Sequence, residues 1–112
     1  MIMRTWRGAV RSSDADRYLE HQGRTGIREY RQTPGNRRAL VIRREHEGLC
    51  EVRTVSFWDS LDSVRAFAGE NPSRAKFYPG DEDLLVEKDL HVDHYDVVSA
   101  DLDTAAITAL AR

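Results

Sequence analysis

The sequence of 112 residues predicts an α+β domain with an antiparallel sheet and the chain order βαββαβ, which is the order of the ferredoxin-like fold. Two observations lead to this prediction. Extended segments rich in β-forming residues alternate with segments whose apolar residues recur at helical spacing. Two extended segments are also adjacent and joined by a short turn, which is typical of a hairpin between two helical crossovers. We expect one domain at residues 1–100 and a C-terminal tail at residues 101–112.

The first half of the pattern begins with a strand at residues 1–10, where Gly8 leaves room for a close approach. Ser12-Ser13-Asp14 predicts a helix N-terminus, because these residue types cap helices and acids suit the positive end of the helix dipole. Gly23 and Gly26 are expected to break or kink this helix. Its residues at helical spacing are Ala15, Tyr18, Leu19 and Gln22, and a turn follows at Thr33-Pro34-Gly35-Asn36.

The second half opens with a hairpin whose strands are Ala39–Glu45 and Leu49–Trp58, joined at His46-Glu47-Gly48. A helix at residues 61–68 follows, with Asp59-Ser60 as its cap and Gly69 as its end. Asn71-Pro72 is expected to start a further helical turn, since Asn caps helices and Pro suits the first position. The last extended candidates are Leu84–Val86 and Val92–Val98.

Both hairpin strands are apolar on two faces. Residues 39–42 are apolar at four consecutive positions, and the next strand carries Val52 and Thr54 on one face and Val55 and Phe57 on the other. Strands of this kind are expected where both faces of a sheet are covered. Two helices on one side leave the other side bare, so we expect a homodimer in which two sheets pack face to face.

The composition argues against several classes of protein. The single cysteine, Cys50, cannot form an intramolecular disulfide, and no apolar run reaches the ~18 residues of a membrane span. The N-terminus has no apolar segment typical of a signal peptide. Arginines gather in the first half of the chain, but no basic run exceeds two residues, so nucleic-acid binding is not expected. These features predict a cytoplasmic protein without membrane partners.

One segment carries a family resemblance. Residues 54–67, with the sequence TVSFWDSLDSVRAF, resemble the strand-to-helix joint of the antibiotic biosynthesis monooxygenase family, in which the strand ends in Trp and a capped helix opens with an acidic-Ser-x-acidic pattern. The first strand, the turn at 30–36 and the closing residues 94–98 are also similar, so the likeness covers about residues 1–98. The resemblance implies the dimeric α+β barrel fold, with a pocket between helices and sheet in each subunit.

The resemblance also implies chemistry, since some members oxygenate phenolic or anthrone-like compounds with molecular oxygen and no cofactor. The leading hypothesis is therefore a cofactor-independent monooxygenase acting on a small electron-rich aromatic, such as a quinol or a polyketide-type phenol. The residues assigned to it are Trp58 and Trp6 for holding the ring, His94 or Tyr78 for handling the proton, and Val64 and Phe67 for excluding water.

Two alternatives come from other functional classes. The first is a non-catalytic dimeric module that binds a small ligand or has a regulatory role. The second is haem binding or degradation, which some family members perform with a His near the end of the second helix. This chain has no His between His46 and His91. His91 and His94 lie three residues apart on an expected strand and so point to opposite faces, and no metal site is predicted.

Overall fold

The computed structural model describes residues 1–101, 103 and 105, so most of the predicted tail at 101–112 lies outside the described residues. It contains five strands, which are β1 (Ile2–Arg11), β2 (Asn36–His46), β3 (Leu49–Trp58), β4 (Leu85–Lys88) and β5 (Asp93–Asp96). They form one antiparallel sheet in the order β2-β3-β1-β4, and β4 and β5 pair with opposite ends of the same edge of β1. The predicted ferredoxin-like α+β fold is confirmed, with its last strand divided into two pieces.

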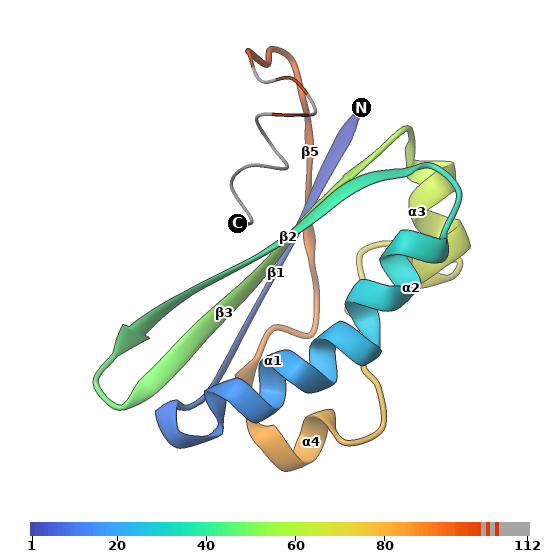
Figure 1. Cartoon of the computed structure of the whole chain (residues 1–112). Coiled ribbons are helices and arrows are strands. Elements are labelled where there is room, and N and C mark those ends of the chain that lie inside the picture. Colours follow the sequence, from blue (N-terminus) through green and yellow to red (C-terminus); the bar gives the residue numbers. More distant parts are fainter. Residues whose placement is uncertain (102, 104, 106–112) are drawn as a thin grey trace.

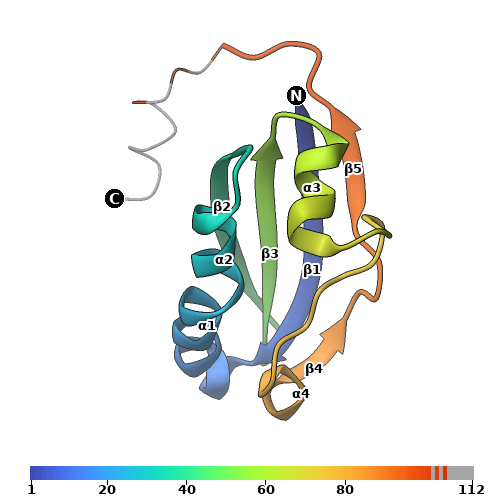
Figure 2. The same cartoon turned by 90° about the vertical axis from the view of Figure 1, so that its right-hand side faces the viewer.

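The helices whose bounds the structure describes lie on one side of the sheet, as Figures 1 and 2 show from two directions. They are a 3₁₀ turn (Ser12–Asp14), α1 (Ala15–Arg24), α2 (Gly26–Gln32), α3 (Leu61–Ala68) and α4 (Asp81–Leu84). We call this side the helix face and the opposite side the open face. No helix among the described residues is long and apolar enough to cross a membrane.

The first helix is divided where the sequence predicted a break. Thr25 separates α1 from α2, and its hydroxyl donates to the His21 carbonyl at 2.9 Å. The predicted capping interaction at its start is wrong, because Ser12–Asp14 forms a 3₁₀ turn and the Asp14 side chain caps nothing. The Asp14 backbone is helical (φ −101°, ψ −2°), whereas a capping residue needs the extended backbone that aims its side chain at the next turn.

The hairpin and α3 form as predicted. Glu47 and Gly48 both have positive φ (51° and 81°), as a two-residue type I′ turn requires. The Ser60 side chain accepts a hydrogen bond from the Ser63 N–H at 3.2 Å, which caps α3, and Gly69 ends the helix with φ 91°.

We call residues 70–80, the segment after α3, the lid segment. The expected turn at Asn71-Pro72 forms, because the Asn71 side chain accepts the Ser73 N–H at 3.1 Å and the Asn71 carbonyl accepts the Arg74 N–H at 3.3 Å. It does not continue as a helix, because the Ala75 N–H donates to the Leu90 carbonyl at 2.9 Å and the Val92 N–H to the Ser73 carbonyl at 2.8 Å. Leu84 was expected to be extended, but it ends the short helix α4, so the strand begins one residue later.

The core on the helix face is divided into two clusters. One contains Trp6, Val10, Ala15, Tyr18, Cys50, Val52, Leu84 and Val92, and the other contains Tyr30, Trp58, Val64 and Phe67. Between them the two central strands carry buried polar side chains, Arg4 on β1 and Thr54 on β3. The core therefore has a polar gap at its centre, above the middle of the sheet.

The open face has an apolar half and a charged half. Pairing places Val55 between Thr5 and Leu40, and Phe57 beside Met3, on the side away from the helices. In the charged half Glu51 pairs with Arg7, Arg44 and Arg53 at 3.1–3.3 Å. Desolvation opposes ionisation of Glu51, but these guanidinium groups outweigh it and lower its pKa to about 2. No described helix covers the apolar half.

Candidate functional site

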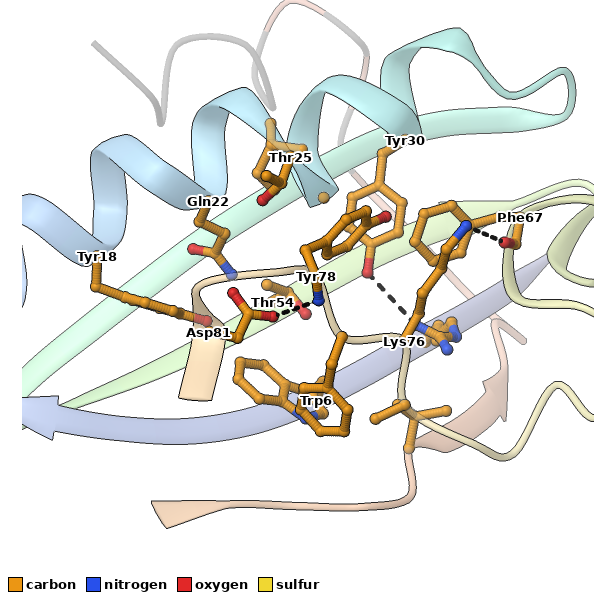
Figure 3. Close-up of a pocket in the computed structure, with 16 residues that line it drawn as sticks. Trp6, Tyr18, Gln22, Thr25, Tyr30, Thr54, Phe67, Lys76, Tyr78 and Asp81 are labelled. Atoms are coloured by element: carbon orange, nitrogen blue, oxygen red, sulfur yellow. Dashed lines mark hydrogen bonds between the residues drawn. The ribbon is translucent and has the colours of Figure 1, made fainter. Parts of the chain in front are cut away.

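A pocket lies in the polar gap between the two core clusters. The strands supply its floor, α1 and α2 supply one wall, and the lid segment with Asp81 closes it (Figure 3). In Figure 3, Trp6 lies below the pocket, Gln22 and Tyr30 reach in from the helices, and Tyr78 stands between them. The cavity volume is about 40 Å³. At about 10–15 Å³ for each water this is room for about three water molecules, so a larger ligand enters only if the lid segment moves.

Arg4 is the buried charge of this pocket. Its side chain is 2 % exposed, and its guanidinium donates to the Tyr30 hydroxyl at 3.4 Å and to the Arg74 carbonyl at 3.1 Å. Its guanidinium carbon lies 5.5 Å from the centroid of the Phe67 ring. Burial lowers the pKa of Arg4, although the Tyr30 interaction opposes this. Among the described residues no carboxylate forms an ion pair with it.

The lid segment is held closed by Glu29 on α2. The Glu29 carboxylate accepts hydrogen bonds from the Lys76 ammonium and the Tyr78 hydroxyl. Burial opposes ionisation of Glu29, but these two donors lower its pKa. Burial and the bond to Glu29 raise the pKa of Tyr78, so its hydroxyl stays protonated and its hydrogen points to Glu29. Lys76 also donates to the Phe67 carbonyl at 3.2 Å.

Asp81 fastens the end of the lid segment to α1. One carboxylate oxygen lies 2.8 Å from His21 Nε2, and the other accepts the Tyr78 backbone N–H at 2.8 Å. The two carboxylates near the pocket, Glu29 and Asp81, are thus each bound to groups of this chain. Neither is directed at Arg4.

Three residues assigned to the site from the sequence line the pocket, namely Trp6, Phe67 and Tyr78. Trp6 Nε1 donates to the Asp89 carbonyl at 2.8 Å, which fixes the indole at the floor. The indole folds back over Gly8, where an added Cβ would lie 2.4 Å from a Trp6 ring carbon. The absence of a side chain at Gly8, expected from the sequence to allow a close approach, therefore leaves the room in which the Trp6 indole packs as an aromatic wall of the pocket.

Trp58 and Val64 lie behind the wall and do not line the pocket. Both are fully buried. The Trp58 ring centroid is 5.8 Å from that of Tyr30 and 5.7 Å from that of Phe67, and its Nε1 donates to the Ser56 hydroxyl at 2.8 Å. Trp58 thus supports the two rings that face the pocket.

His94 lies on β5 directly opposite Arg4 and is absent from the pocket lining. Its Nε2 is buried and has no hydrogen-bond partner among the described residues. Burial lowers the pKa of His94 below its ordinary value of 6.5, the Arg4 charge lowers it further, and Asp93 opposes them. The imidazole is therefore neutral at neutral pH.

This shift predicts a pH dependence of stability. Because the pKa of His94 is lower in the folded state, the unfolded chain binds more protons, and the free energy of unfolding falls as pH drops through the range just below 6.5. We expect His94→Gln to flatten this dependence between about pH 7.5 and about pH 5.5, measured by urea unfolding. The control His46→Gln, at an exposed strand end, keeps the wild-type slope. Equal slopes in His94→Gln and the wild type would contradict the assignment.

Several pocket residues were not assigned from the sequence, above all Arg4, Gln22 and Tyr30. One signal was present for Arg4. It is two residues from Trp6 on a strand. Residues at that spacing share a face, so the sequence places Arg4 on the same face of the sheet as Trp6. Its burial depends on the lid segment, which no local pattern predicts.

Comparisons with known proteins test the resemblance. No family model matches the sequence, and no curated protein matches it. A crystal structure of a candidate antibiotic biosynthesis monooxygenase from Bacillus cereus matches with a TM-score of 0.64 at 18% identity, over 91% of this chain and 97% of that one. The chain has the fold of the antibiotic biosynthesis monooxygenases. The family resemblance seen in residues 54–67 is thus confirmed at the level of the fold.

A second solved structure with the antibiotic biosynthesis monooxygenase fold is a variant of MhuD with two manganese protoporphyrin IX molecules bound per active site. It matches with a TM-score of 0.58 at 15% identity, over 92% of this chain and 100% of that one. The pocket described here does not fit such a group. Its lining contains no His or Cys, the residues that hold the iron in most haem proteins.

Proposed function

We propose that the protein is a monooxygenase that acts without a cofactor on a small, planar, electron-rich aromatic bound in the helix-face pocket. The observation that carries this proposal is the lining, in which Trp6, Tyr30, Phe67 and Phe77 surround a single buried cation, Arg4. Aromatic walls favour a flat ring, because ring faces and edges attract one another. A site closed to water also protects reactive intermediates from side reactions.

The proposed reaction converts an aromatic C–H opposite a ring hydroxyl into a carbonyl, which turns a phenol into a quinone. Molecular oxygen supplies one atom to the new carbonyl, and its second atom leaves as water with the two hydrogens lost from carbon and hydroxyl. All four electrons that reduce oxygen come from the substrate, so no external reductant is needed. The protein then contributes orientation, exclusion of water and stabilisation of charge.

The roles of the chain's residues follow from their contacts. Trp6 and Phe67 are proposed to hold the ring. Tyr78 gives its hydrogen to Glu29 in the closed state, so it acts in holding the lid segment rather than as a base. The proposed proton acceptor is His94, whose neutral imidazole has an unpartnered Nε2 beside Arg4.

We also propose that a second copy of the chain covers the open face. Met3, Leu40, Val55 and Phe57 form a continuous apolar area there, and the neighbouring Tyr95 is 54 % exposed. In the charged half of this face, Glu51 already pairs with Arg7, Arg44 and Arg53, so we place the contact with the second copy on the apolar half. Two identical sheets related by a two-fold axis bury such an area completely.

Oxygen consumption tests the proposed activity. We expect the protein to consume one oxygen molecule per molecule of a phenol or anthrone that carries hydrogen opposite its oxygen, with a quinone as product, in the presence of a metal chelator. Phe67→Ala should lower the rate by about tenfold or more, because it removes a wall of the pocket. Arg24→Ala, a change on the exposed part of α1, is the matched control and keeps the wild-type rate.

The alternative of a non-catalytic binding module is favoured by one observation, which is that the cavity of about 40 Å³ is held closed by Glu29. The same experiment separates the two functions. Tight binding of an aromatic without any oxygen consumption across a panel of quinols, anthrones and phenols would overturn the oxygenase and establish the binding module.

A further inference from the structure

The buried charge of this pocket, Arg4, has no ion-pair partner among the described residues. Lys76 is paired with Glu29, and Asp81 is bound by His21 and the Tyr78 backbone, whereas the contacts of Arg4 are a hydroxyl, a carbonyl and a ring face. Buried charges in proteins are ordinarily paired, because desolvation of an unpaired ion is costly. Asp81, the carboxylate that lines the pocket, is already bound elsewhere, so the guanidinium of Arg4, which is 2 % exposed, lacks a counter-ion.

Two polar atoms of the lining also lack hydrogen-bond partners, and they come from opposite sides of the pocket. Arg4 Nε, from the sheet, is a donor without an acceptor, and Gln22 Oε1, from α1, is an acceptor without a donor. Both side chains are more than nine-tenths buried, with Gln22 at 7 % exposure. Buried polar groups almost always have hydrogen-bond partners. The two unpartnered groups of this pocket therefore indicate a ligand that offers an acceptor to Arg4 and a donor to Gln22.

We propose that this pocket binds its ligand as an aromatic oxyanion that also carries a hydroxyl, with the negative oxygen on Arg4 and the hydroxyl donating to Gln22 Oε1. The oxyanion supplies the ion-pair partner that Arg4 lacks, and the hydroxyl satisfies the remaining acceptor. Acidic phenols and hydroxyarene carboxylates share this chemistry.

If the bound anion is the substrate, this inference names the chemical form of the substrate in the proposed function, and to that extent it rests on that function. An ionised ring oxygen raises the electron density of the ring, which is the form that gives electrons to oxygen most readily. Binding the anion directly also removes the need for a base to ionise that oxygen within the pocket. Recognition of the anion, however, does not depend on turnover and is measured in the absence of oxygen.

The test is an anaerobic calorimetric titration with two matched probes, 6-hydroxy-2-naphthoate, whose hydroxyl and carboxylate lie at opposite ends of the ring system, and its neutral methyl ester. We expect the acid to bind about tenfold to hundredfold more tightly than the ester, since hydrogen bonds to charged groups are the stronger ones. Arg4→Met should remove this preference and leave the ester affinity within about threefold of the wild type. Arg4→Lys keeps the charge and should retain a preference for the acid.

A second pair of measurements concerns Gln22. In the wild type, 6-hydroxy-2-naphthoate should bind about fivefold or more tightly than 2-naphthoate, which lacks the hydroxyl, and Gln22→Leu should abolish this difference. A purely structural role of Arg4 makes a different prediction, because Arg4→Met would then lower the thermal midpoint. With an uncompensated charge removed, we expect the midpoint to stay or to rise.

Equal affinities of the wild type for acid and ester, no binding of either probe, or a preference for the acid that survives Arg4→Met would each overturn the inference. Its failure is distinguishable from that of the proposed function. Anion-selective binding without oxygen consumption overturns the oxygenase alone, and oxygen consumption with neutral substrates alone overturns the oxyanion inference and leaves the oxygenase standing.

Discussion

Val55→Asp is expected to convert a dimer into a monomer that keeps its fold. Val55 lies at the centre of the open face, between Thr5 on β1 and Leu40 on β2. A two-fold interface contains every substituted position twice, so the change places two carboxylates in an apolar contact. Burying unpaired charge in an interface costs several kcal/mol, and we expect the dimer dissociation constant to rise by about a hundredfold or more.

Sedimentation velocity at micromolar concentration measures this result, with circular dichroism as the check on folding. Val41→Asp is the matched control, because Val41 neighbours Leu40 on the same strand, is 38 % exposed, and points to the helix face. This variant should remain dimeric. A monomeric wild type, or a Val55→Asp protein that stays dimeric, would show that the open face is not the interface.

Trp58→Ala is expected to lower the free energy of unfolding by about 3–5 kcal/mol, the usual cost of removing a fully buried Trp. The side chain is 0 % exposed and packs against both Tyr30 and Phe67. Its loss leaves a cavity behind the pocket wall and an unpaired Ser56 hydroxyl. Urea unfolding at neutral pH gives the measurement.

Trp58→Phe separates a supporting role from direct contact with ligand. It keeps an aromatic ring in the cluster, so the protein should fold with a smaller loss of stability and bind 6-hydroxy-2-naphthoate within about threefold of the wild type. If Trp58→Phe instead abolished binding while stability stayed unchanged, Trp58 would contact the ligand directly, as the sequence hypothesis held.

Prediction from sequence succeeds where structure is specified locally. β3 and α3 have the predicted bounds because Ser60 caps the helix, Gly69 ends it and the Glu47-Gly48 turn fixes the hairpin. In the lid segment the turn at Asn71-Pro72 forms as predicted, because Asn71 caps it locally. The course of the chain after this turn was not predictable, because its backbone bonds to Leu90 and to the Val92 N–H, which are distant in sequence.

The site was harder to predict for the same reason. Whether Trp58 lines a pocket or supports one depends on which side chains lie in front of it. Tyr30 lies in front of Trp58 because the first helix is interrupted at Thr25 and Tyr30 belongs to the separate helix α2. The spacing from Trp6 places Arg4 on the correct face of the sheet. That Arg4 has no counter-ion is seen only once all its neighbours in the fold are known.

The central claim is that the helix-face pocket is completed by an aromatic anion on Arg4. A crystal structure of the protein with 6-hydroxy-2-naphthoate tests it most directly. We predict a carboxylate oxygen about 2.7–3.2 Å from the Arg4 guanidinium, the hydroxyl on Gln22, and the Tyr78 hydroxyl parted from Glu29. A ligand bound outside this pocket, or an Arg4 that pairs instead with a carboxylate of the protein, would contradict the account.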